Sequence, residues 1–173
     1  ESLDPCEDGL EWWVDTFGDE CTLEELTKHS TKQWDYVRWL AVKCLSHKDQ
    51  VKLAVYCAEK VIHFYEGPSD APKEAIEAAK VWVENPTVEN TKKAEAVVRA
   101  ACVVACVDVT DYVPSYEALA AYRVAKLAAS AVYMSSCAAR AVLASADTFY
   151  DIKDRETFIK DTMEYLLTLE TVA

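Results

Sequence analysis

Glycine and proline are scarce in this chain of 173 residues, which has three glycines and five prolines. All-β folds depend on frequent turn residues of these kinds, so their scarcity argues against a sandwich or barrel and favours long helices. Histidine is also rare, with three scattered copies. No motif pairs a histidine with a nucleophile or with a set of metal ligands. We therefore expect an all-α protein that is not an enzyme and uses no metal or cofactor.

The chain also lacks a hydrophobic run long enough to cross a membrane. The best candidate, residues 127–139, has thirteen residues between Lys126 and Arg140, whereas a spanning helix needs about 20. The N-terminus is acidic, unlike the basic start of a secretory signal. The seven cysteines are odd in number and irregular in spacing, as expected of reduced thiols. These features predict a cytoplasmic protein without membrane contact.

The net charge of −12 is concentrated at one end of the chain. Residues 1–29 contain ten acidic residues and a single base, Lys28. Residues 30–173 are nearly balanced, with twenty acidic and seventeen basic residues. A negative field of this kind repels nucleic acid and attracts basic proteins. The charge distribution therefore argues against direct nucleic-acid binding and points to a basic protein partner.

Apolar spacing and capping residues predict seven or eight helices in a single domain. Thr22 and Glu25 have the spacing of a capping box, which predicts a helix from Leu23. Pro72 is typical of a first helical turn, and Thr87 is typical of an N-cap. The expected organisation is an acidic N-terminal segment (residues 1–30), a helical core (31–150) and a closing helix (151–173).

Alanine dominates the second half of the expected core. Residues 94–146 contain seventeen alanines. Small side chains on most faces indicate helices that approach each other closely and are surrounded by other helices. We therefore expect the helices over 87–107 and 115–146 to form an antiparallel hairpin at the centre of the bundle.

Several motifs in the core are distinctive when taken together. They are Trp39-Leu-Ala-Val42, Cys57-Ala-Glu59 with Phe64, and Pro72-x-x-Ala75-Ile-Glu-Ala-Ala79 with Trp82. With the alanine-rich helices that follow, they make residues 34–150 resemble the Imm5-like family of immunity proteins. The resemblance implies a protein that binds and neutralises a toxin, often in bacterial competition. It brings no catalytic residues with it.

The acidic N-terminal segment is the first candidate binding site, because its aromatic residues stand among carboxylates as at protein interfaces. The carboxylates would steer a basic toxin or effector, such as a nuclease, and the tryptophans would anchor it. In the alternative interpretation, Trp12, Trp13 and Phe17 pack on the core as a lid with the acids outward. The candidate residues are Asp8, Glu11, Trp12, Trp13, Asp15, Asp19, Glu20, Glu24 and Glu25.

A second candidate site consists of four basic residues in apolar surroundings. Converging between helices, they would bind an anion or a small molecule. Otherwise they reach solvent or pair with acidic neighbours. The basic residues are Arg99, Arg123, Lys126 and Arg140.

A further alternative is a phage-encoded nucleic-acid mimic that inhibits a host-defence nuclease. Such a mimic would need acidic residues spread over a broad surface.

The cysteines offer little chemistry by comparison. Cys102, Cys106 and Cys137 could approach one another in an alanine-rich hairpin, but structural zinc sites have four ligands. Small apolar packing is the favoured interpretation of these thiols. Cys57 and His63 are six residues apart, which does not place them on one face of a helix.

Overall fold

The computed structural model describes residues 6–29, 33–67, 69–107, 116–134, 136–149 and 151–169. These residues form nine α-helices, with no β-strand among them, so the all-α class is confirmed with one helix more than expected. The helices are α1 (Glu7–Phe17), α2 (Leu23–Thr27), α3 (Trp34–Lys43), α4 (His47–Val61), α5 (Ala71–Glu84), α6 (Val88–Val107), α7 (Tyr116–Ala131), α8 (Ser136–Ala146) and α9 (Ile152–Leu166). A short 3-10 turn, Ile62–Phe64, continues α4.

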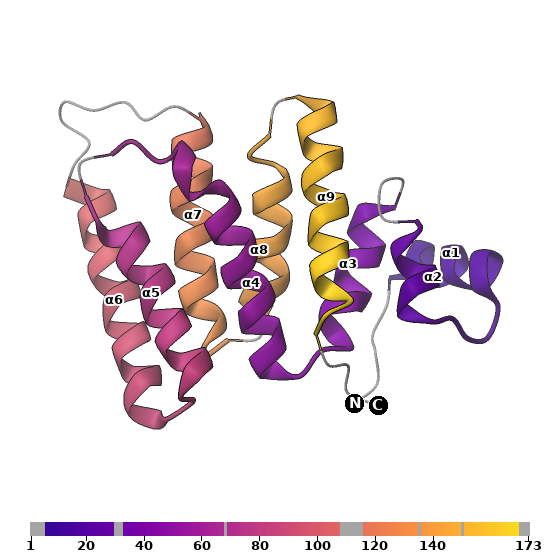
Figure 1. The fold of residues 1–173 in the computed structure, drawn as a ribbon, viewed down its shortest axis with the longest axis horizontal. Coiled ribbons are helices and arrows are strands. Elements are labelled where there is room, and N and C mark those ends of the chain that lie inside the picture. Colours follow the sequence, from indigo (N-terminus) through magenta and orange to yellow (C-terminus); the bar gives the residue numbers. More distant parts are fainter. Residues whose placement is uncertain are drawn as a thin grey trace.

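The helices form a bundle with its N-terminal end displaced to one side (Figure 1). Helices α5 and α6 lie at one end, α4, α7 and α8 in the middle, and α9 and α3 beyond them. Helices α1 and α2 project past α3. Within the described ranges, no helix is sufficiently long and apolar to span a membrane.

An alanine-rich antiparallel hairpin does lie at the centre, but α7 and α8 form it. Helix α7 packs against α4, α5, α6 and α8, and its residues Ala121, Ala125 and Ala128 are fully buried. On α8, Ala138 and Ala141 are fully buried as well. Side chains this small allow close approach of several helices at once. The helix over 87–107 does contact α7, but its expected central position is wrong, because α6 packs mainly on α5 at the edge of the bundle (Figure 1).

The helix expected over 115–146 is in fact two helices. The Ser130 hydroxyl donates to the carbonyl of Lys126 at 2.9 Å, and the N–H of Val132 bonds to Ala129 three residues back at 3.3 Å. Such tightened bonds are typical of a helix end. The chain then turns through Tyr133 and starts α8, without a glycine or proline to mark the turn in the sequence.

Helix boundaries that depend on capping chemistry match the sequence expectations. The Thr22–Glu25 capping box is present at the start of α2. Pro72 lies in the first turn of α5. The hydroxyl of Thr87 accepts from the N–H of Asn90 at 3.2 Å, which caps α6. Gly18 ends α1 with a φ of 75°, a conformation that favours glycine.

Helix α9 closes the bundle by packing on α4. The rings of Tyr56 and Tyr165 stack with centroids 4.1 Å apart, and the Tyr56 hydroxyl donates to the carbonyl of Asp161 at 3.3 Å. Below this surface contact, Phe158 and Leu166 are buried in the core. The C-terminal helix is therefore part of the main core.

Asp49 is a buried carboxylate in the first turn of α4. It accepts hydrogen bonds from the Ser46 hydroxyl and the Lys52 ammonium, both at 2.6 Å. Burial acts to raise the pKa of Asp49, but the hydrogen bonds from Lys52 and Ser46 outweigh it, so the pKa lies below its ordinary value of 3.8. The charged form of Asp49 therefore stabilises the start of α4.

Replacing Asp49 with asparagine should lower the stability at neutral pH by about 1 kcal/mol, because the charge-assisted hydrogen bonds are lost. A carboxyl with a depressed pKa in the folded state contributes stability above its unfolded pKa, and that contribution is lost as the pH falls through the folded value. Urea unfolding from about pH 7 to pH 2 should therefore bring wild type and Asp49→Asn together at the acid end. A difference that does not change with pH would contradict this role of the carboxylate.

Candidate protein-binding surface

The aromatic residues of the N-terminal segment point inward and attach α1 to α3. Ring centroids lie 5.4 Å apart for Trp12 and Tyr36, 5.0 Å for Trp13 and Phe17, and 5.1 Å for Phe17 and His29. Trp12, Trp13 and Phe17 are half-buried and pack against the hydrophobic core. This placement matches the lid interpretation, with the tryptophans used for attachment.

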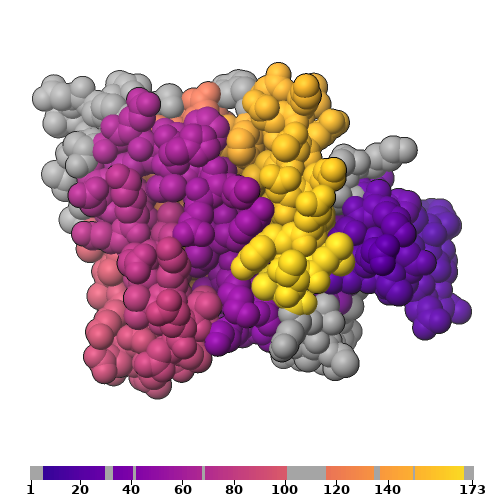
Figure 2. Space-filling view, viewed as in Figure 1, coloured from indigo at the N-terminus to yellow at the C-terminus, as the bar shows by residue number. Residues whose placement is uncertain are grey.

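The carboxylates of the same segment point outward. All eight acidic residues within 6–29 are exposed, on a unit that projects from the bundle (Figure 2). Within the described part of the chain, the single ion pair of this unit joins Lys28 to Glu24 at 3.6 Å. Six carboxylates have neither a capping role nor an ion pair with any residue that the structure describes: Glu7, Asp8, Glu11, Asp15, Asp19 and Glu20.

Two carboxylates of the segment have identifiable local effects. The backbone hydrogen bond from Thr22, together with the bond from its hydroxyl, lowers the pKa of Glu25, which is therefore committed to capping α2. Burial raises the pKa of Tyr36, and the nearby charge of Asp8 raises it further. The negative potential of the unit thus reaches the aromatic contact with α3.

Two exposed apolar residues on α1 were missed at the sequence level. Leu10 is 52% exposed and Val14 is 55% exposed. They lie four residues apart on one face of the helix, next to Glu7 and Glu11. The sequence itself indicated this exposure. Leu10 and Val14 are each two residues from the inward-facing Trp12 and therefore lie on the opposite side of the helix. On the outer face, these aliphatic side chains therefore supply the apolar contact expected of the tryptophans.

The four basic candidates are distributed over three helices. Arg99 on α6 is exposed and pairs with Glu95 on its own helix. Arg123 on α7 and Arg140 on α8 are exposed, and Lys126 is half-buried. None of the four lines the pocket described below. Their convergence on a bound anion stays a prediction.

The thiol candidates are partly described. Cys57 is fully buried, and burial raises its pKa to about 12, so it is almost entirely in the unreactive thiol form at neutral pH. His63 is exposed, with its ring against Phe64. The side chains of Cys102 and Cys106 lie outside the described residues. Elsewhere in the described ranges, no three His, Cys, Asp or Glu side chains gather to hold a metal ion.

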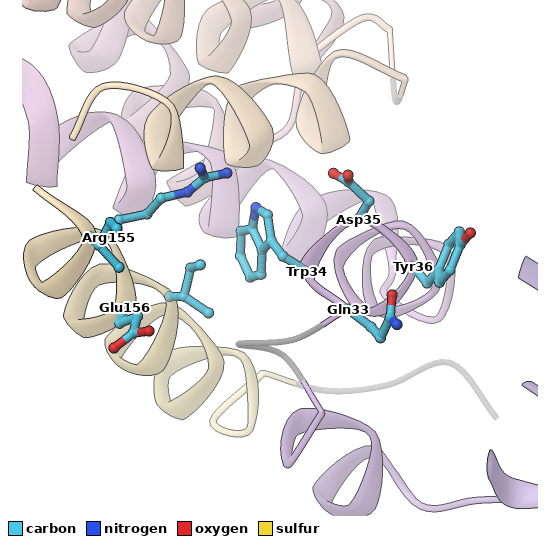
Figure 3. Close-up of a pocket in the computed structure, with 8 residues that line it drawn as sticks. Gln33, Trp34, Asp35, Tyr36, Arg155 and Glu156 are labelled. Carbon is cyan, nitrogen blue, oxygen red and sulfur yellow. The ribbon is translucent and has the colours of Figure 1, made fainter. Parts of the chain in front are cut away.

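A pocket of about 440 Å³ opens between the start of α3 and the first half of α9. Arg155 and Glu156 project from α9, and Trp34 reaches from α3 into the space between the two helices (Figure 3). Trp34 is 6% exposed, and its indole N–H has no hydrogen-bond partner among the described residues. The lining residues are Gln33, Trp34, Asp35, Tyr36, Ile152, Arg155, Glu156 and Ile159.

The pocket adjoins the projecting N-terminal unit. Tyr36 lines the pocket and also contacts Trp12 of α1. The sequence does not indicate this pocket, because its two walls are far apart in the chain. The only local signal is the apolar spacing of Ile152 and Ile159, which are seven residues apart on one face of α9.

Comparisons of the chain with protein-family models, curated proteins and solved structures find no match. The resemblance to the Imm5-like family therefore stays a prediction, carried by the motifs within residues 34–150.

Proposed function

We propose that this protein binds a basic protein partner and neutralises it without catalysis, as an immunity-like inhibitor of a toxin or effector in the cytoplasm. The observation that carries the proposal is the outer face of α1. There, exposed carboxylates that pair with no base in the described ranges border the exposed side chains of Leu10 and Val14. An apolar contact with a charged border is the usual composition of a protein interface. The Imm5-like motifs are the reason to expect a toxin.

The mechanism is electrostatic steering followed by steric blocking. Uncompensated carboxylates on a projecting unit attract a partner with positive potential and raise its association rate. Leu10 and Val14 then lose their contact with water against the partner, which slows dissociation. The inward aromatics keep α1 in place, so the surface is formed before the partner arrives.

A paired charge reversal tests the proposal. The purified protein is used to capture proteins from its native host, and the captured partner is then purified. The variant Glu11→Lys/Asp15→Lys should bind that partner about tenfold more weakly and with a smaller dependence on salt. The matched control, Glu74→Lys/Glu84→Lys, reverses two exposed carboxylates on α5 at the far end of the bundle and should bind normally.

The captured protein must also meet two requirements. It should be basic, and its own harmful activity should stop when the wild-type protein is added but persist with the α1 variant. Equal binding by both reversed variants, or a partner whose activity is unaffected, would reject the proposal.

A further inference from the structure

The pocket between α3 and α9 has one carboxylate that its surroundings do not neutralise. Asp35 pairs with Arg38 on its own helix at 3.1 Å, and Arg155 pairs with Asp147 at 3.1 Å. These two pairs cancel their own charges. Glu156 is exposed and forms no ion pair with any residue that the structure describes. The pocket therefore has a net negative charge at its rim.

The rest of the pocket is suited to an apolar chain. Ile159 is 3% exposed and forms part of the core, whereas Ile152 is 75% exposed and stands at the edge. Trp34 reaches into the space between the helices and forms one wall of the pocket (Figure 3), and Tyr36 adds a half-buried aromatic ring. A volume of about 440 Å³ leaves room for one long side chain. The occupant therefore needs an apolar stem and a positively charged end.

Lysine and arginine side chains have this combination. Their methylene stems pack along apolar surfaces while the charged ends stay near carboxylates or water. Because Asp35 and Arg155 are already paired, Glu156 is the charge that an occupant meets: it would repel an acidic side chain, and an apolar side chain would leave it unused. The pocket adjoins the inner side of α1 through Tyr36, so a partner on the outer face of α1 reaches it by extending past that helix.

We infer that the pocket between α3 and α9 receives a lysine or arginine side chain of the basic protein partner, an inference that rests on the proposed function for its partner. Glu156 binds the charged end. Ile152 and Ile159 contact the stem. The pocket supplies a specific anchor, whereas the outer face of α1 supplies mainly steering.

Two matched probes test the pocket in the full chain. One is Nα-acetyl-lysine methylamide, and the other is Nα-acetyl-norleucine methylamide, which keeps the stem and lacks the charge. The methyl NMR signals of the four isoleucines report binding, since Ile152 and Ile159 line the pocket while Ile62 and Ile76 do not. The lysine probe should shift the two pocket signals in a saturable way, and the norleucine probe should shift them much less.

Two glutamine variants locate the charge. Glu156→Gln should weaken lysine-probe binding about threefold, as expected for one exposed ion pair. Glu164→Gln changes the net charge equally on the same helix outside the pocket and should have no effect. Equal binding of the two probes, equal shifts of all four isoleucines, no saturable shift with the lysine probe, or an unchanged affinity in Glu156→Gln would overturn the inference.

The inference and the proposed function fail separately. If the lysine probe does not bind, but the variant Glu11→Lys/Asp15→Lys still binds the partner more weakly than wild type, only the pocket assignment is wrong. If the lysine probe binds as expected, but the variant Glu11→Lys/Asp15→Lys binds the partner as tightly as wild type, the proposed function of the acidic face is wrong and the cation-binding pocket stands.

Discussion

Replacing Leu166 with alanine should destabilise the protein by about 2–5 kcal/mol, the usual cost of a large-to-small change in a packed core. Leu166 is fully buried in the last turn of α9. The lost methyl groups leave a cavity where α9 joins the main core, and its neighbours are themselves fixed by packing. Thermal and urea unfolding of the full chain, followed by circular dichroism, measure the change.

The adjacent residue provides the control for this change. Leu167 is 44% exposed, so Leu167→Ala removes the same atoms from a position that faces water. Its effect should stay within about 0.5 kcal/mol, as for most surface substitutions. Similar losses of stability from both variants would mean that α9 does not bury Leu166 against the core.

Enlarging a central alanine should also cost stability. Ala128 is fully buried on α7, which has helices on several sides. Ala128→Leu forces three extra carbon atoms into this contact and should destabilise the protein by about 1–3 kcal/mol. For a domain of this size, that corresponds to a fall in melting temperature of roughly 2–12 °C. Leucine is a good helix former, so the loss would come from packing rather than from helix propensity.

Ala96→Leu is the matched control for the central alanine. Ala96 is exposed in the middle of α6, so the larger side chain there enters solvent. Its stability should be close to that of wild type. A tolerated Ala128→Leu would show that the α7–α8 hairpin has space at its centre, contrary to the buried alanines described above.

Local chemistry was the most predictable part of this fold. The Thr22–Glu25 capping box, Pro72 and the Thr87 cap act through groups within a few residues of one another, so the sequence contains all the information they need. The outward acids of α1 were predictable for the same reason, because ten of the first 29 residues are acidic and few can be buried.

Features that depend on distant contacts were not predictable. The end of α7 near Ser130 has no glycine or proline, and the helical pattern continues through it. The edge position of α6 depends on which of the other helices pack against each face of α7. The amino-acid composition does not determine that choice. The pocket requires Trp34 and Glu156, which are far apart in the chain, to line the same space. The orientation of Trp12 was left open because an aromatic ring among acids fits either an attachment or an interface.

The position of Tyr36 has a consequence for the lifetime of any complex. Its ring touches the inner side of α1 at Trp12 and also borders the α3–α9 pocket, so the helix that carries one contact region adjoins the other region. A partner held at one region meets the other at a high effective concentration, without a second search through solution. Two contacts that are each weak can then give a long residence time, and release requires both to open together.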